Sequence, residues 1–168
     1  MGNKDCLELA KTMAFSSVET LMFSYECALK MKDTDGDFVE CGVGHGLLSK
    51  TIVEYLDFSK VPKDFFLFDT YAGIPLEQGK ASEIKNMQRL NETHYADPYF
   101  EKVAALFSDF PNVKLVQGIL PESLKKQDLD ILGWRDVPVN SKVVGSIASK
   151  TQPQIKQVFI KRNSELTD

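Results

Sequence analysis

A run of three alternate glycines follows an acidic residue in the stretch Glu40-Cys41-Gly42-Val43-Gly44-His45-Gly46. Glycine lets the backbone turn sharply and approach a bound molecule closely. A loop that leads into a helix also presents free backbone N–H groups to an anion. The acid ahead of the glycines suits a cationic amino group, and the order ExGxGxG differs from the GxGxxG fingerprint of dinucleotide-binding loops. The stretch therefore predicts a cradle for a small ligand that carries an amino group.

A second acid, Asp69, follows the apolar run 64–68. A carboxylate at the end of the next strand can hydrogen-bond a ribose diol. Together with Glu40 and the glycines, Asp69 favours S-adenosylmethionine as the ligand, and the spacing disfavours a nicotinamide-binding oxidoreductase. The competing interpretation is that the glycines only allow tight packing and that Asp69 is a solvated strand end.

Alternating helices and strands must position these residues. Helical periodicity covers 6–31, and apolar runs predict strands at 38–41, 64–68 and 113–118. Further helices are expected at 47–56, from 97 onward and at 121–124, and the polar stretch 70–91 is expected to be a surface segment over the site. Strands that alternate with helices predict a parallel sheet with right-handed crossovers. The expected fold class is thus α/β, Rossmann-like, with a truncated parallel sheet and helices on both faces.

Composition excludes several classes of protein. The net charge is −4 and 43% of the residues are hydrophobic, so nothing marks the surface as a nucleic-acid partner. No apolar run is long enough to span a bilayer, and the first residues do not read as a signal peptide. Cys6, Cys27 and Cys41 show neither metal-binding nor disulfide spacing. A reduced, cytoplasmic setting without a membrane partner is expected.

Several blocks, in order, resemble the macrocin-O-methyltransferase-like family over about residues 10–125: 36–43, 67–75, 97–100 and 116–124. The resemblance implies an S-adenosylmethionine-dependent O-methyltransferase with a sugar or natural-product hydroxyl as its small-molecule acceptor. It implies that the loop cradles the methionine part, Asp69 holds the ribose, Thr70 and Tyr71 flank the adenosine, and Gly118 and Ile119 close over the adenine. The loop residues concerned are Glu40, Cys41, Gly42, Val43, Gly44 and Gly46.

The family pattern stops after Leu124. The resemblance also implies a Mg²⁺ ion held by aspartates of a fourth strand, but Asp128-Leu129-Asp130 lacks the preceding apolar strand, so no metal ligands are assigned. No catalytic residue is assigned either, because His45 and His94 are interpreted as exposed loop residues. A non-catalytic binding or structural module is therefore the alternative to a methyltransferase.

The tail, about residues 131–162, resembles part of the amidotransferase domain of the glutamate synthase large subunit. The nucleophile of that domain is an N-terminal cysteine, and the start Met1-Gly2 predicts no glutaminase activity. We therefore expect two parts, 1–125 and an unrelated segment 126–168, joined as a chimera. The strand-like residues 157–161 are expected to cover the open sheet edge, either within one chain or by exchange in a homodimer.

Overall fold

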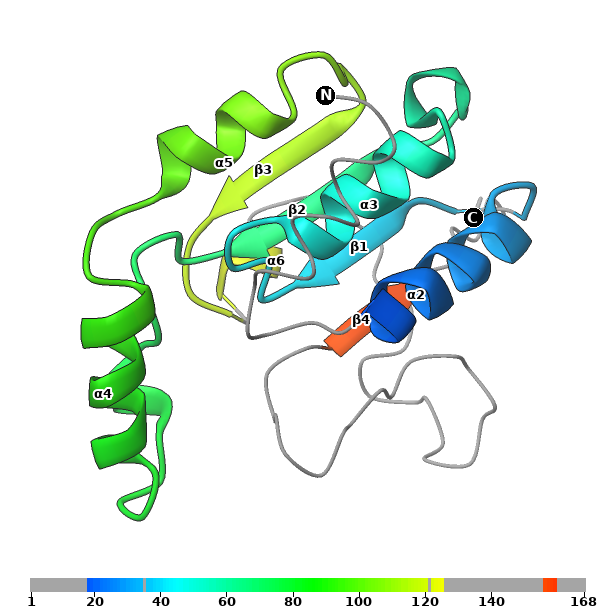
Figure 1. Cartoon of the computed structure of the whole chain (residues 1–168). Coiled ribbons are helices and arrows are strands. Elements are labelled where there is room, and N and C mark those ends of the chain that lie inside the picture. The colour runs from blue at the N-terminus through cyan, green and yellow to red at the C-terminus, as the bar shows by residue number, and fades with distance from the viewer. Residues whose placement is uncertain (1–17, 35, 121, 126–155, 160–168) are drawn as a thin grey trace, which may run out of the picture.

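The computed structural model describes residues 18–34, 36–120, 122–125 and 156–159, which form an α/β unit (Figure 1). Its strands lie in the order β3-β2-β1-β4. The helices are α2 (Val18–Met31), α3 (Leu47–Tyr55), α4 (Ile84–His94), α5 (Phe100–Leu106) and α6 (Glu122–Lys125), with short 3-10 turns η1 (Phe58–Lys60) and η2 (Leu76–Gln78). The strands are β1 (Phe38–Cys41), β2 (Phe65–Asp69), β3 (Val113–Gln117) and β4 (Lys156–Phe159).

The first three strands form the predicted parallel sheet. Phe38 of β1 stands opposite Phe65 of β2, which in turn stands opposite Val113 of β3. β1 and β2 consist almost wholly of buried residues, as parallel strands covered on both faces should. The sequence-based prediction of an α/β fold with a parallel sheet is confirmed for β1 to β3.

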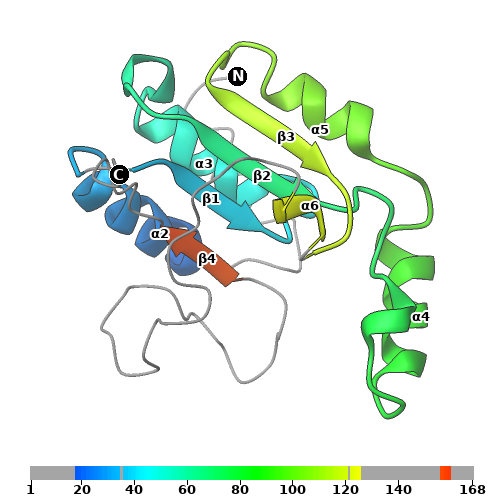
Figure 2. The same cartoon turned by 180° about the vertical axis from the view of Figure 1, so that it is seen from behind.

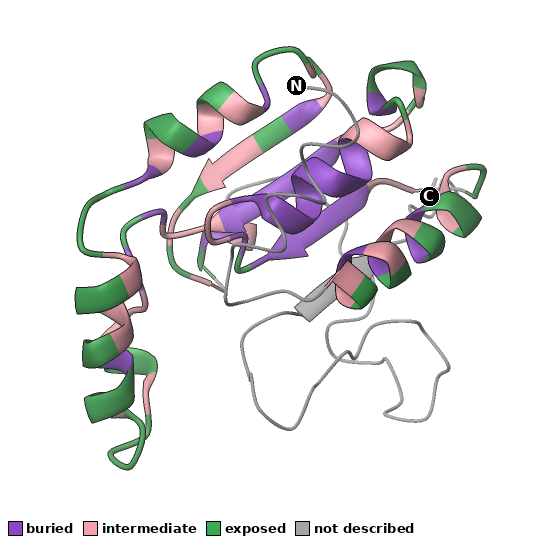
Figure 3. Cartoon of the chain, in the orientation of Figure 1, coloured by how far each residue is buried: buried purple, intermediate pink, exposed green. Residues whose placement is uncertain are grey.

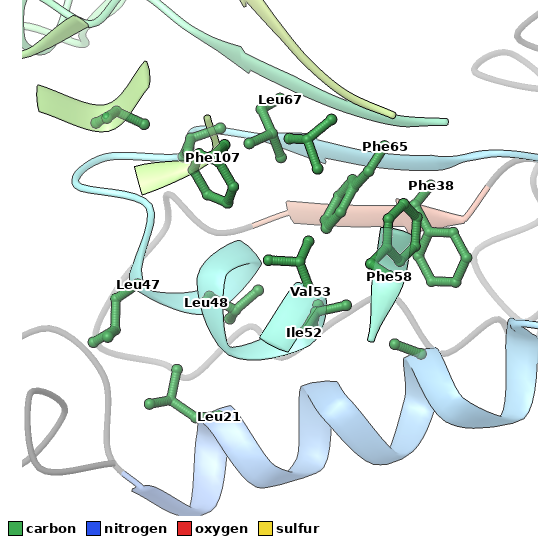
Figure 4. Close-up of a cluster of buried hydrophobic side chains, with 14 of the residues drawn as sticks. Leu21, Phe38, Leu47, Leu48, Ile52, Val53, Phe58, Phe65, Leu67 and Phe107 are labelled. Atoms are coloured by element: carbon green, nitrogen blue, oxygen red, sulfur yellow. The ribbon is translucent and has the colours of Figure 1, made fainter. Parts of the chain in front are cut away.

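One face of the sheet carries the larger core. Side chains from β1, β2 and β3 pack there against α3, together with Leu21 of α2 and with Phe107 directly after α5 (Figure 4). Val103 of α5 belongs to the same cluster. α3 lies across this face between α2 and α5 (Figures 1 and 2). Its first seven residues are all buried, and the ribbon coloured by burial shows α3, β1 and β2 as the buried centre (Figure 3). This packing fixes where the loop before α3 must lie.

The opposite face carries a smaller apolar cluster. Alternation along the strands turns Val39, Cys41, Phe66 and Phe68 to this side, because successive side chains of a strand point to opposite faces. Leu124 of α6 packs against the cluster. Helices were predicted on both faces, and within the described ranges α6 is the helix that covers this second one. The coverage is uneven because α6 has only four residues.

β4 lies along the outer edge of β1 and runs antiparallel to it, with Val158 opposite Val39. The sequence predicted strand character in this segment and an open sheet edge that it could cover. In the structure this pairing lies within one chain. An antiparallel strand fills this edge without a crossover helix, because its backbone groups need only meet those of β1.

The polar stretch after β2 contains a helix that the sequence analysis missed. α4 projects away from the sheet (Figures 1 and 2), and Met87 is its buried residue. Few apolar residues mark its periodicity, so composition alone indicated a surface loop. At the N-terminal end of the described part, α2 begins at Val18; the predicted helical residues 6–17 lie outside the described residues. None of the described helices has the length and apolar character needed to cross a membrane.

We predict that Leu67→Ala lowers the free energy of unfolding by about 2–5 kcal/mol, because Leu67 is fully buried between β1 and β3 and its loss leaves a cavity. Urea denaturation followed by circular dichroism measures the change. Leu29→Ala is the matched control, since Leu29 is 41% exposed on α2 and its truncation should change stability by no more than about 0.5 kcal/mol. Equal losses in the two variants would contradict the assigned core.

Candidate functional site

The glycine loop and Asp69 meet at the carboxyl edge of the sheet. Because β1 and β2 are parallel neighbours in register, Cys41 and Phe68 end side by side. The N–H of Gly42 donates to the carbonyl of Phe68 (2.8 Å), which continues the ladder past the strands. The N–H of Gly44 then donates to Oδ2 of Asp69 (2.9 Å), 25 residues away in sequence. The structure thus brings together the two elements that the sequence analysis linked.

The loop adopts a conformation that favours glycine. Gly44 and Gly46 have φ values of 55° and 79°, and Gly46 is the N-cap residue of α3. A Cβ atom on Gly46 would stand 3.2 Å from the ring of Phe107, so α5 packs closely over the loop. Left-handed φ and this close approach together explain the glycine at position 46. The tight-packing interpretation is therefore correct for Gly46, alongside any binding role of the loop.

Asp69 is the most heavily engaged side chain of the site. Oδ1 accepts hydrogen bonds from the N–H of Tyr71 (2.7 Å) and from the hydroxyl of Tyr99 (3.0 Å), while Oδ2 accepts from Gly44. The hydroxyl of Thr70 lies at 3.4 Å from Oδ1. Asp69 is thus an organising acceptor for three segments, and it is not the solvated strand end of the competing interpretation.

Glu40 lies beneath the loop rather than in it. Its side chain points toward α3, where the hydroxyl of Ser49 donates to Oε2 (2.6 Å), and the residue is 2% exposed. Burial raises the pKa of Glu40 to about 8, against the lowering effect of the Ser49 hydrogen bond; the negative charge of Asp69 adds a smaller increase. Burial thus favours the protonated form of Glu40, which carries no charge to attract an ammonium group.

The other residues predicted to contact a ligand divide into two groups. Tyr71 is fully buried and its hydroxyl donates to the carbonyl of Leu67 (2.8 Å), so its ring belongs to the core. Cys41 and Val43 are also buried. Gly118 joins the site through a hydrogen bond from its N–H to the carbonyl of Asp69 (2.9 Å), and Ile119 beside it is 37% exposed. The residues available near the surface are thus the loop backbone, Thr70 and Ile119.

Two tyrosines at the site were missed by sequence reasoning. Tyr95 and Tyr99 pack with the ring of His45, at centroid distances of 5.6 and 4.8 Å. A ring nitrogen of His45 also lies 3.0 Å from the carbonyl oxygen of His94. His45 is half-buried rather than exposed, contrary to expectation. Tyr99 lies in the block 97–100, which was interpreted as a helix start and as part of the family resemblance, and Tyr95 precedes that block.

No cluster of three or more potential metal ligands occurs in the described part of the chain. The residues Asp128 and Asp130, which the sequence analysis considered and did not assign, lie outside the described residues.

We predict that Glu40 makes stability fall as the pH rises between its ordinary pKa of 4.5 and its folded value of about 8. In this window the folded protein keeps a proton that the unfolded chain has released, so the free energy of unfolding drops by up to about 1.4 kcal/mol per pH unit. Below the window both states hold the proton, and above it both have lost it. Glu40→Gln should flatten this slope in urea denaturation between pH 5 and pH 8.

The control for this experiment is Glu101→Gln, because Glu101 is an exposed glutamate of α5. It should leave the pH dependence of the wild-type protein in place. A wild-type slope that persists in Glu40→Gln would assign the titration to another group.

Among solved structures, the chain is similar to the O-methyltransferase NovP. The likeness has a TM-score of 0.48 and 23% sequence identity, and it covers 61% of this chain and 46% of the other. Values this low carry no functional assignment.

Curated relatives match this chain locally and are glutamate synthases. The ferredoxin-dependent glutamate synthase 1 of Arabidopsis thaliana is 46% identical over 43 residues, which is 26% of this chain and 3% of that protein. The NADPH glutamate synthase large chain of Bacillus subtilis is 50% identical over 55 residues, 33% of this chain and 4% of that protein. The chain thus spans a few per cent of the length of these relatives. The resemblance of the tail to a glutamate synthase is confirmed.

The sequence model of the family described as "Glutamine amidotransferases class-II" matches residues 73–168, more than half of the chain. Together with the glutamate synthase relatives, this match overturns the prediction of an O-methyltransferase, and with it the expected methyltransferase class. The physical reason for the error is that an α/β sheet places glycine loops and acids at neighbouring strand ends whatever reaction the protein serves. The chain belongs to the class-II glutamine amidotransferase family.

Proposed function

We propose that this chain supplies a segment of a class-II glutamine amidotransferase domain in an enzyme of the glutamate synthase type. The single observation that carries the proposal is the family match over residues 73–168, supported by 50% identity to a glutamate synthase over 55 residues. The chemistry that follows is use of the glutamine amide as a nitrogen source, with the remainder of the enzyme supplying the other steps.

The folded unit supports a joint role for the matched region and the residues before it. The region 73–168 takes in α4, α5, β3, α6 and β4. β3 pairs with β2 on one side, while β4 pairs with β1 on the other. The amidotransferase-matching residues therefore hold both edges of a sheet whose centre precedes them. In this fold, β3 and β4 of the matched region have β2 and β1 as their pairing partners.

We predict that this chain's matching segment can replace its counterpart in the Bacillus subtilis large chain. The exchanged enzyme should keep at least about a tenth of its glutamine-dependent rate, a loss of about 1.4 kcal/mol in barrier height. Glutamate formation from glutamine measures it. A segment of the same composition in scrambled order is the control and should abolish the rate. Circular dichroism shows whether the exchanged enzyme is folded. A folded exchanged enzyme that is as inactive as the scrambled control would contradict the proposal.

A second candidate function is binding of a nucleoside-containing ligand at the carboxyl edge of the sheet. What favours it is the contact between the Gly44 N–H and the Asp69 carboxylate at the ends of two parallel strands, the edge where open α/β sheets bind ligands. With this candidate function we also propose that the sheet is Rossmann-like. S-adenosylmethionine, expected from the sequence, is one such ligand, and its contacts would come from the loop 40–46, Asp69, Thr70, Gly118 and Ile119.

We predict that S-adenosylhomocysteine binds the chain more tightly than NAD, measured by titration calorimetry. Asp69→Ala should weaken this binding by about 1–3 kcal/mol, because a half-buried hydrogen-bond acceptor is lost. Asp57→Ala is the matched control, since Asp57 is an exposed aspartate away from the strand ends. Thermal melting confirms that both variants are folded. Binding that Asp69→Ala leaves unchanged would remove Asp69 from the site, and no binding at all would refute this candidate.

A further inference from the structure

We propose that the hydroxyl of Tyr99 occupies the place on Asp69 that a ligand diol would take, so that the segment 94–99 is a latch that holds the site closed. The inference rests on the second candidate function, a nucleoside-containing ligand. The Tyr99 hydroxyl would compete with the ligand for Asp69 and thereby set the affinity of the chain for that ligand.

Hydrogen bonds from within the chain already occupy the Asp69 carboxylate. Oδ1 accepts hydrogen bonds from the Tyr71 N–H and the Tyr99 hydroxyl, and Oδ2 accepts one from the Gly44 N–H. The Thr70 hydroxyl lies 3.4 Å from Oδ1 and makes its shorter bond to the carbonyl of Gly73 (2.5 Å). A carboxylate has about four lone-pair positions, and a diol donates two hydrogen bonds. The bonds from Gly44 and Tyr71 are backbone bonds that shape the two loops themselves. Tyr99 is therefore the stronger side-chain donor to Asp69, and its departure leaves the bonds from the Gly44 and Tyr71 N–H groups in place.

The Tyr99 hydroxyl is a donor similar to a hydroxyl of the ligand. Burial, and next the negative charge of Asp69, raise the pKa of the Tyr99 hydroxyl above its usual value. The hydroxyl therefore stays protonated and keeps donating across the physiological pH range. A phenol O–H on a carboxylate offers the same chemistry as one hydroxyl of a ribose.

The latch packs against the glycine loop and Asp69. The latch contacts both halves of the cradle: Tyr99 bonds to Asp69, while Tyr95 and the His94 carbonyl contact His45 of the glycine loop. Tyr99 is 3% exposed, so its ring closes this side of the site.

The latch also has fixed attachments at both ends. Before it, the side chain of Asn91 exchanges two hydrogen bonds with the backbone of Ile74. After it, the Lys50 ammonium donates to the carbonyl of Leu106 at the end of α5 (2.8 Å). Within the segment, the Tyr99 N–H also donates to the carbonyl of Tyr71 (3.1 Å), so the opening motion falls to residues 94–98 and the side chain of Tyr99.

The test compares Tyr99→Phe with Tyr95→Phe in the full chain. Both changes remove one hydroxyl and keep a ring of the same aromatic cluster, but no described hydrogen bond joins the Tyr95 hydroxyl to Asp69. We expect Tyr99→Phe to bind adenosine about three- to tenfold more tightly than wild type, the value of one net hydrogen bond, and Tyr95→Phe to bind it unchanged. With 2′,3′-dideoxyadenosine, which lacks the diol, the gain should vanish.

Adenosine affinity in Tyr99→Phe that is equal to or weaker than wild type overturns the latch, as does a gain that persists with the dideoxy probe. A ligand-free measurement separates the latch from the proposed ligand class. Amide hydrogen exchange at Tyr95 and Tyr99 should be about threefold faster in Tyr99→Phe than in Tyr95→Phe, because the bond to Asp69 is gone. If no variant binds adenosine, the nucleoside candidate fails, and faster exchange still supports a latch, whereas unchanged exchange rejects it.

Discussion

The parallel pairing of β1 with β2 is the constraint on which the rest of the structure depends. Its register sets Cys41 beside Phe68, so the glycine loop and Asp69 leave the sheet at the same edge and bond to each other through Gly44. The crossover that parallel strands require is α3, and its burial over the sheet fixes the direction in which the loop turns. A slip of one residue would turn every side chain of β1 to the wrong face. Core and site are thus consequences of one pairing.

The burial of Glu40 shows how this pairing shapes the chemistry of the site. Alternation along β1 turns Glu40 toward α3, on the same face as Phe38, and the Ser49 hydroxyl meets it there. Burial in that position raises the pKa of the acid to about 8 and favours its neutral form, because water is excluded. Its present role is a hydrogen bond between strand and helix. The surface of the cradle is then left to backbone N–H groups and to Asp69.

The family match covers the two outer strands of the sheet. Residues 73–168 match class-II glutamine amidotransferases, and they include strands on both sides of the β1–β2 pair. β3 prolongs the parallel sheet, whereas β4 runs antiparallel along β1. A hydrogen-bonding edge accepts either direction of strand, since the backbone groups of β1 carry no sequence information. Geometry at the sheet edge therefore joins segments that sequence patterns assigned to separate parts.

The sequence by itself determined the local elements: apolar runs for β1 to β3, helical spacing for α3, and the glycines that φ values of 55° and 79° favour at positions 44 and 46. These follow from neighbours within a few residues. Function was misjudged, because the ExGxGxG order and Asp69 describe a strand-end loop and not a reaction. Only the tertiary structure decided that Glu40 is buried and neutral, that Tyr71 lies in the core, and that Tyr99 bonds to Asp69. Each of these depends on contacts between segments far apart in the chain, which no local pattern of residue types encodes.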